Sequence, residues 1–253
     1  MSTAPAPRRP LAFILALLAL LIVGVGAIAY AANRVAGTDS AVGVPTAIPL
    51  TTPTPVATPT PTAPATPTAS PIAFADCSTA TFGADLQPLN PPADIHKYSA
   101  APPTTINPGK LYLVTMTTNR GVIKLCVQPQ LAPVTANIFV TLVRNHFYDG
   151  LKFPRADKGL VIQGGSPQND QQGGPGFSFA DEPVLNKYVL GCLAIANAGP
   201  NTSGSQFFIC TGDDSAKFAP SYNLFGKVMT GVDVAQAINV GDTMTSVTVA
   251  EQQ

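Results

Sequence analysis

The chain has 253 residues, of which 45% are hydrophobic and only 11% are charged, and its 14 Lys and Arg balance its 14 Asp and Glu. Without an excess of basic residues to neutralise phosphates, a dedicated nucleic-acid-binding protein is excluded. The hydrophobic content at zero net charge also excludes a chain that is disordered throughout. The 26 prolines are about twice the usual share, and they are densest in the first third of the chain.

The N-terminal segment predicts a membrane anchor. Arg8 and Arg9 precede an uncharged apolar run over residues 11–32, and about 22 residues rising about 1.5 Å each span the ~30 Å hydrocarbon core. The positive charges place residues 1–10 in the cytoplasm and everything beyond the helix outside it. The alternative is a signal peptide cleaved near Ala29-Tyr30-Ala31, which would leave a secreted protein. We therefore expect a single-pass protein of a bacterial cell envelope.

Residues 33–75 form a linker rich in Pro, Thr and Ala. Repeats of Thr-Pro occur here, and no charged residue occurs between Ser40 and Ala75. Prolines at every second to fourth position remove backbone donors and favour the extended polyproline II conformation. We expect a disordered stalk that separates the folded part from the membrane, rather than a site that recruits a proline-binding module.

The folded part begins with a loop-rich lead-in over residues 76–110, and the domain proper covers residues 111–253. Residues 111–118 and 122–127 predict a β-hairpin, with Asn119-Arg120-Gly121 as its turn. Ala132-Pro133 then opens a helix that ends near Asn145, with apolar residues at helical spacing.

The remainder of the domain predicts short strands separated by Gly, Pro and Asn turns. These strands are centred near Val161, Leu193, Phe207 and Leu224, and a last one covers residues 245–249. Because strands dominate and helices are few, the pattern favours a closed or nearly closed antiparallel barrel.

Common catalytic and metal-binding motifs are absent from the sequence. His96 and His146 have no metal-type partner three or four residues away, and we expect both to be structural or exposed. Ser203-Gly204-Ser205 lacks the Gly-x-Ser-x-Gly frame of a nucleophile elbow, and the glycine-rich segments lack the Lys-Ser/Thr of a phosphate loop. We expect neither a metal nor a cofactor.

Four longer motifs stand out instead. They are Phe153-Pro-Arg155, Val161-Ile-Gln163-Gly-Gly165, the 14-residue block 196–209 and Leu224-Phe-Gly-Lys-Val228. With them the sequence resembles the cyclophilin family of peptidyl-prolyl cis-trans isomerases from about Tyr112 to Val249, and the block 196–209 is the most specific part. The resemblance implies a mainly β fold, a closed eight-stranded antiparallel barrel capped by two helices. It also implies an enzyme that acts on extended, proline-containing peptides.

The chemistry of such an enzyme needs no nucleophile. Rotation about the bond before proline has a barrier of ~18–20 kcal/mol because the nitrogen lone pair is delocalised into the carbonyl. A catalyst has to hold the ring, let the preceding carbonyl turn and offer a donor to the nitrogen as its lone pair returns. A permanently charged guanidinium suits this task, and by similarity Arg155 takes this role.

The resemblance also assigns substrate-binding residues. Gln163 matches the glutamine that hydrogen-bonds the substrate backbone, and Asn197 matches the residue whose main chain pairs with the extended peptide. Phe208 matches the aromatic floor of the proline pocket. The predicted set is completed by Phe153, Leu160, Val161, Ala196, Gln206, Phe218 and Tyr222.

Several positions depart from the family pattern. Pro154 stands where the family usually has His, and Asp157 and Lys158 stand where relatives have an aliphatic residue and proline. Lys217 occupies the position of the Trp or His that shapes the binding of the drug cyclosporin. We expect an altered groove, with retained but weaker isomerase activity and poor sensitivity to cyclosporin.

The four cysteines, placed outside the cytoplasm, allow three disulfide connectivities. Cys192 and Cys210 fall on consecutive predicted strands, so a hairpin would place them opposite each other and leave Cys77 for Cys126. The alternative is that Cys192 and Cys210 are buried free thiols.

Together these features predict a monomeric, membrane-tethered, extracytoplasmic prolyl isomerase that assists the folding of exported proteins. The alternative, motivated by the changes over residues 154–158, is a noncatalytic peptide-binding or chaperone module on the same barrel.

Overall fold

The computed structural model describes residues 70–214 and 216–253. The expected membrane anchor over residues 11–32 and most of the expected linker lie outside these ranges. Within them, no helix is both long enough and apolar enough to cross a membrane. The lead-in and, apart from residue 215, the predicted domain are described in full.

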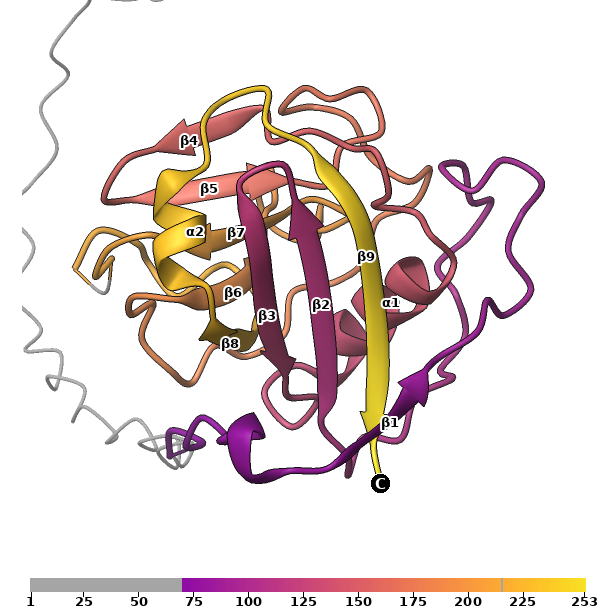
Figure 1. The fold of residues 1–253 in the computed structure, drawn as a ribbon, viewed down its shortest axis with the longest axis horizontal. Coiled ribbons are helices and arrows are strands. Elements are labelled where there is room, and N and C mark those ends of the chain that lie inside the picture. Colours follow the sequence, from indigo (N-terminus) through magenta and orange to yellow (C-terminus); the bar gives the residue numbers. More distant parts are fainter. Residues whose placement is uncertain (1–69, 215) are drawn as a thin grey trace, which may run out of the picture. The chain divides into compact units, whose positions relative to one another are not determined.

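The described residues contain one antiparallel sheet of nine strands, in the order β1-β9-β2-β3-β8-β6-β7-β5-β4 (Figure 1). In chain order the strands are β1 (Phe82–Asp85), β2 (Tyr112–Thr118), β3 (Gly121–Val127), β4 (Arg155–Asp157), β5 (Val161–Gly164), β6 (Cys192–Ile195), β7 (Phe207–Cys210), β8 (Leu224–Thr230) and β9 (Met244–Gln252). The predicted hairpin is confirmed, because β2 and β3 pair along their whole length.

This sheet differs from the closed eight-stranded barrel that we expected. Its order ends at β1 on one side and at β4 on the other, and β4 pairs with β5 alone among the described strands. Where closure would require a ladder between residues 150–153 and β9, the backbone makes an isolated bridge, Lys152 opposite Thr243, with a few adjacent hydrogen bonds. Pro154 lacks the N–H that would extend β4 toward this bridge. We call this junction between residues 150–153 and the start of β9 the seam, and it is bridged but not closed.

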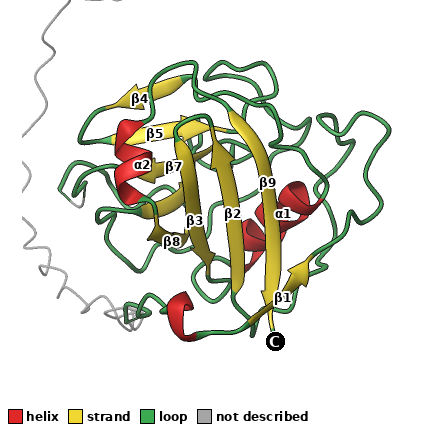
Figure 2. Cartoon of the chain, in the orientation of Figure 1, coloured by secondary structure: helices red, strands yellow, loops and turns green. Residues whose placement is uncertain are grey.

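Two helices cover the sheet (Figure 2). α1 (Pro133–Arg144) packs against β8 and β9, and α2 (Val232–Ala237) packs against β3. Pro133 starts α1 at a position where a missing N–H breaks no helical hydrogen bond. The Glu182 carboxylate, which comes from a distant loop, accepts the N–H groups of Val134 (2.9 Å) and Thr135 (2.8 Å) and so caps the helix.

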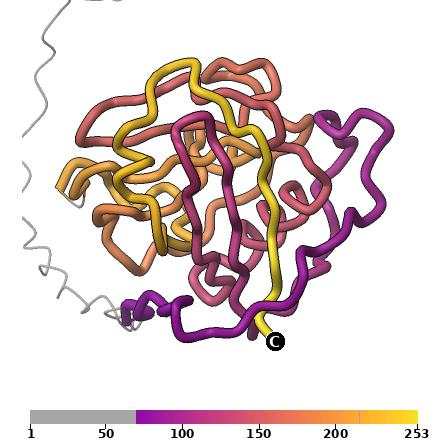
Figure 3. Tube along the Cα trace, viewed as in Figure 1, coloured from indigo at the N-terminus to yellow at the C-terminus, as the bar shows by residue number. Residues whose placement is uncertain are grey.

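The lead-in over residues 76–110 lies against the domain and passes beside α1 (Figure 3). Two asparagines of the helix region hold it: Asn137 accepts the N–H of Thr105 (2.8 Å), and Asn145 accepts the N–H of Leu89 (2.8 Å). The lead-in also supplies β1, which pairs with β9 at the edge of the sheet. It is therefore part of the folded domain, although its sequence shows no clear period.

Side-chain alternation along the strands produces two hydrophobic clusters. On β7, Phe207 and Ile209 face the main core, where the rings of Phe139 and Phe207 lie 5.5 Å apart. The intervening Phe208 and Cys210 belong to a second cluster on the other face of the sheet. Its buried members are Val161, Tyr188, Cys192, Ala194, Phe208, Cys210 and Leu224. We call this set the outer cluster.

All four cysteines are paired. A disulfide joins Cys77 of the lead-in to Cys126 of β3, with their Cα atoms 5.8 Å apart. A second joins Cys192 of β6 to Cys210 of β7, with Cα atoms 5.0 Å apart. These are the two pairings set out from the sequence, and the second disulfide lies within the outer cluster.

Candidate active site

The outer cluster borders a cavity of about 200 Å³. The residues that line it come from β4, β5, β7 and three loops, and they are Arg155, Val161, Gln163, Gln171, Ala196, Asn197, Phe208, Phe218 and Tyr222. Except for Gln171, all of them belong to the set predicted from the sequence. We call this space the small cavity.

Aromatic side chains form the apolar wall of the small cavity. The Phe208 ring centroid lies 5.8 Å from that of Phe218 and 5.4 Å from that of Tyr222. Behind them, the buried Tyr188 hydroxyl donates to the Tyr222 carbonyl (2.8 Å) and accepts the Tyr222 N–H (2.9 Å). Burial raises the pKa of Tyr188 to about 12, so its hydroxyl remains a donor. Tyr188 belongs to none of the four motifs, and sequence reasoning therefore missed it.

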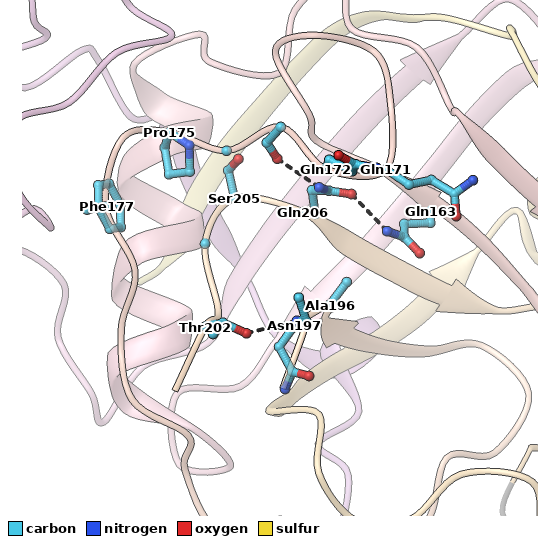
Figure 4. Close-up of a pocket in the computed structure, with 14 residues that line it drawn as sticks. Gln163, Gln171, Gln172, Pro175, Phe177, Ala196, Asn197, Thr202, Ser205 and Gln206 are labelled. Carbon is cyan, nitrogen blue, oxygen red and sulfur yellow. Dashed lines mark hydrogen bonds between the residues drawn. The ribbon is translucent and has the colours of Figure 1, made fainter. Parts of the chain in front are cut away.

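A guanidinium and two amides form the polar side of the same cavity. Arg155 lies opposite Gln163 in the pairing of β4 with β5, and its Nη1 is 3.4 Å from Oε1 of Gln163. Its Nε makes a shorter contact of 2.7 Å with Oδ2 of Asp157. Gln163 Nε2 donates to Oε1 of Gln206 (2.8 Å), and Gln206 Nε2 donates to the Gly173 carbonyl (2.7 Å) (Figure 4). This series of hydrogen bonds keeps the Gln163 oxygen turned toward Arg155.

A larger cavity of about 530 Å³ (Figure 4) adjoins the small one. The two share Gln163, Gln171, Ala196 and Asn197 in their linings. The rest of its lining is Gln172, Gly173, Gly174, Pro175, Phe177, Ala198, Thr202, Gly204, Ser205 and Gln206. None of these side chains is charged. The residues between 171 and 177 were not predicted, because they follow the Gln-Gly-Gly motif in a loop without a pattern of its own. The two cavities together form a groove, and among the described residues that line it Arg155 is the one that is charged.

Three predicted site residues lie outside the small cavity. Phe153 is fully buried in the main core, where its ring lies 6.5 Å from that of Phe207, so it supports the sheet and does not face the groove. Leu160 packs at the edge of the outer cluster but lines neither cavity. Gln206 lines the larger cavity.

The charges that depart from the family pattern have separate partners. Lys158 Nζ donates to two backbone carbonyls at the C-terminal end of α2, at 2.9 and 2.6 Å. Lys217 Nζ pairs with the fully buried Asp214 at 2.9 Å. Both ammonium groups are therefore held outside the small cavity, whereas Asp157 contacts the guanidinium of Arg155.

The arrangement combines an apolar pocket with a cation at its rim. Neither histidine lines the groove: His96 packs edge-on against Phe147 with ring centroids 5.3 Å apart, and His146 Nδ1 lies 3.1 Å from the Asp149 carboxylate. In the described ranges, no three His, Cys, Asp or Glu side chains gather as a metal site would require. The site can hold an apolar ring against Phe208 while presenting N–H donors to an atom beside that ring.

Comparisons with known proteins agree with this geometry. The family model described as "Cyclophilin type peptidyl-prolyl cis-trans isomerase/CLD" matches residues 113–252, more than half of the chain. A Mus musculus "Peptidyl-prolyl cis-trans isomerase-like 1" is 38% identical over 150 residues, covering 57% of this chain and 88% of that protein.

Two further matches come from a bacterium and a protozoan parasite. A Helicobacter pylori "Peptidyl-prolyl cis-trans isomerase" is 38% identical over 142 residues, covering 54% of this chain and 86% of that protein. A crystal structure of a Cryptosporidium parvum cyclophilin type peptidyl-prolyl cis-trans isomerase matches with a TM-score of 0.52 at 27% identity. It covers 55% of this chain and 97% of that structure.

Proposed function

The chain belongs to the cyclophilin-type peptidyl-prolyl cis-trans isomerases, and we propose that it rotates Xaa-Pro bonds with Arg155 as its catalytic residue. The observation that carries this proposal is the convergence of Arg155, Gln163 and Phe208 on one small cavity. The three side chains come from β4, β5 and β7, and their types match the needs of the reaction: a permanent donor, a group that binds the peptide backbone and an apolar surface for the ring.

In the proposed mechanism the prolyl ring of the substrate lies between Phe208, Phe218 and Tyr222. In the planar state the imide nitrogen cannot accept a hydrogen bond, because its lone pair is delocalised. In the twisted state the lone pair returns, so a donor at that point binds the transition state more strongly than the ground state. The Arg155 guanidinium supplies the donor from a half-buried position, where solvent weakens its field less than in bulk water. No proton is transferred.

The rest of the groove holds the peptide on either side of the proline. Gln163 is oriented by Gln206, and its oxygen accepts from the substrate backbone as well as from Arg155. Ala196 and Asn197 border both cavities, so an extended peptide that fills both passes along their main chain. Because none of the described residues that line the larger cavity is charged, the cavity favours uncharged residues beside the proline.

A noncatalytic peptide-binding or chaperone module is the second candidate function. It is motivated by the changed residues over 154–158, which lie beside Arg155 in the sequence. Both candidates use the same groove and the same peptides. They differ only in whether the protein raises the rate of rotation about the Xaa-Pro bond.

We further propose that the domain works outside the cytoplasm, as a monomer held to the membrane by residues 11–32, on proteins that have been exported. The apolar run and its flanking arginines support this proposal from the sequence. Two disulfides are consistent with it, since disulfides persist in oxidising compartments and are rare in the cytosol. Fractionation of cells that express the tagged chain tests the location, and recovery in the soluble cytosolic fraction would contradict it.

Exchange spectroscopy on a proline-containing peptide tests the activity. The uncatalysed bond turns over in tens to hundreds of seconds, and the purified chain should shorten this time. Arg155→Ala should lower the catalysed rate about 100-fold, while Arg144→Ala, on the end of α1 and outside the groove, should leave it unchanged. Equal rates for wild type and Arg155→Ala would reject the mechanism. Peptide binding without acceleration by the wild type would favour the second candidate.

A further inference from the structure

We propose that Asp157 is a positioning residue for catalysis: its carboxylate holds the Nε edge of Arg155 and so turns the remaining N–H groups toward the small cavity. This inference rests on the proposed function, because it assumes that Arg155 is the catalytic residue. Asp157 is one of the departures from the family pattern, so the resemblance assigns it no role.

Strand geometry places the two side chains together. Side chains two residues apart on a strand project from the same face of a sheet, and Arg155 and Asp157 are the first and last residues of β4. They lie opposite Gln163 and Val161 of β5, both of which line the small cavity. A carboxylate at position 157 is therefore within reach of the guanidinium at the rim of the cavity.

The contact with Asp157 is much closer than the contact with Gln163. The Arg155 Nε lies 2.7 Å from Oδ2 of Asp157, whereas its Nη1 lies 3.4 Å from Oε1 of Gln163. The donor is charged in both contacts, but only the contact with Asp157 also has a charged acceptor at a short distance, which makes it a strong charge-assisted hydrogen bond. The longer distance to Gln163 makes a weak one. Because the carboxylate takes the Nε edge, the Nη groups are left to donate to the substrate.

The neighbouring cations do not compete for this carboxylate. Lys158 donates to the end of α2, and Lys217 pairs with Asp214. The Asp157 side chain is 48% exposed, so the ion pair with Arg155 adds little to folding stability. Its main effect is to restrict the orientation of a long side chain that would otherwise have only the weak contact with Gln163.

Steady-state exchange rates and peptide titrations of the full chain test this role. Asp157→Ala should lower kcat about fivefold, the loss expected when one long side chain is no longer held in place, with KM and the urea midpoint unchanged. Asp157→Asn should stay within about twofold of wild type, because its amide oxygen still accepts from Nε. Asp85→Ala removes an exposed charge from β1 and serves as the matched control.

A double variant separates this inference from the proposed function. If Asp157 acts through Arg155, then Arg155→Ala/Asp157→Ala should be no slower than Arg155→Ala alone. A further fivefold loss in the double variant would overturn the positioning role, and so would an Asp157→Ala rate equal to or above that of wild type. Either result leaves the proposed function intact if Arg155→Ala alone shows its expected loss of about 100-fold. Full activity of Arg155→Ala overturns both.

Discussion

Replacing Asp242 by Asn should weaken the seam of the sheet in a pH-dependent way. The Asp242 carboxylate, just before β9, accepts hydrogen bonds from Arg120 Nε (2.8 Å), Asn119 Nδ2 (2.8 Å) and the Asn239 N–H (2.7 Å). These donors come from the β2–β3 turn and from the connection between α2 and β9. The pKa of Asp242 is lowered from 3.8 to about 2, mainly by the hydrogen bond from Arg120 and also by that from Asn119.

The size of the effect follows from that pKa. A carboxylate whose pKa falls from 3.8 to about 2 on folding contributes at most about 2.4 kcal/mol to the free energy of unfolding. The Asp242 side chain is only 8% exposed, but that of Arg120 is 44% exposed, so solvent screens their attraction. We therefore expect the Asp242 carboxylate to contribute about 1–2 kcal/mol to the free energy of unfolding. Because the folded pKa is the lower one, this stability is complete above the unfolded pKa and is lost as the pH falls toward 2.

Urea unfolding of wild type and Asp242→Asn at several pH values measures this difference. Glu251 also has a lowered pKa, mainly because of its hydrogen bond with Tyr112, so the stability of both proteins falls in acid, and only the difference between them reports on Asp242. That difference should be about 1–2 kcal/mol near pH 7 and should shrink steadily between about pH 5 and pH 2. Asp85→Asn, on an exposed part of β1, should match wild type throughout. A difference that stays constant with pH would refute the reasoning.

Three further predictions concern the disulfides, a helix cap and the groove. Removing the Cys77–Cys126 disulfide with a double Ala variant should lower the free energy of unfolding by about 4 kcal/mol, because the disulfide closes a loop of 49 residues. It should leave peptide affinity unchanged. Removing the Cys192–Cys210 disulfide, which closes a loop of 18 residues, should lower the free energy of unfolding by about 3 kcal/mol. It should also weaken peptide binding, because this disulfide packs with Phe208, and equal binding losses for the two disulfides would contradict this. Glu182→Ala should lower the free energy of unfolding by about 1–2 kcal/mol through loss of the α1 cap, and an unchanged urea midpoint would exclude that role. Gln206→Ala should weaken peptide affinity about fivefold in calorimetry by freeing Gln163, whereas unchanged affinity would show that Gln163 needs no support.

Elements whose residues interact with near neighbours could be predicted from the sequence. The helix expected between Ala132 and Asn145 is observed at Pro133–Arg144, because its apolar spacing and initial proline act within a few turns. The hairpin of β2 and β3 likewise needs only a short turn between two apolar runs. The cysteine pair on β6 and β7 could be proposed because those strands are joined by one loop.

Short elements that depend on distant partners were not located in the sequence, although the resemblance implied a second helix. β1, β4 and α2 have four, three and six residues, too few for a period to be recognised. β1 forms because β9 offers it an edge, and β4 forms because β5 does. The seam near Lys152 remains bridged but unclosed for the same reason: the ends of these short strands decide how far each ladder extends.

The sequence by itself determined the family, the positions of the main strands along the chain and most of the residues of the groove, because these depend on motifs in which each residue keeps its role wherever the motif occurs. Only the tertiary structure decided where Phe153 and Asp157 belong. β4 starts only at Arg155, and the Phe153 N–H donates a hydrogen bond across the seam to the Asp242 carbonyl. The Phe153 ring therefore enters the core and does not share the face of the Arg155 guanidinium. The partners of Asp157, Lys158 and Lys217 were also open, because the fold decides which of the groups within reach each side chain contacts. Asp157 pairs with Arg155 of its own strand and Lys217 with Asp214 three residues earlier, whereas Lys158 reaches backbone carbonyls at the end of α2.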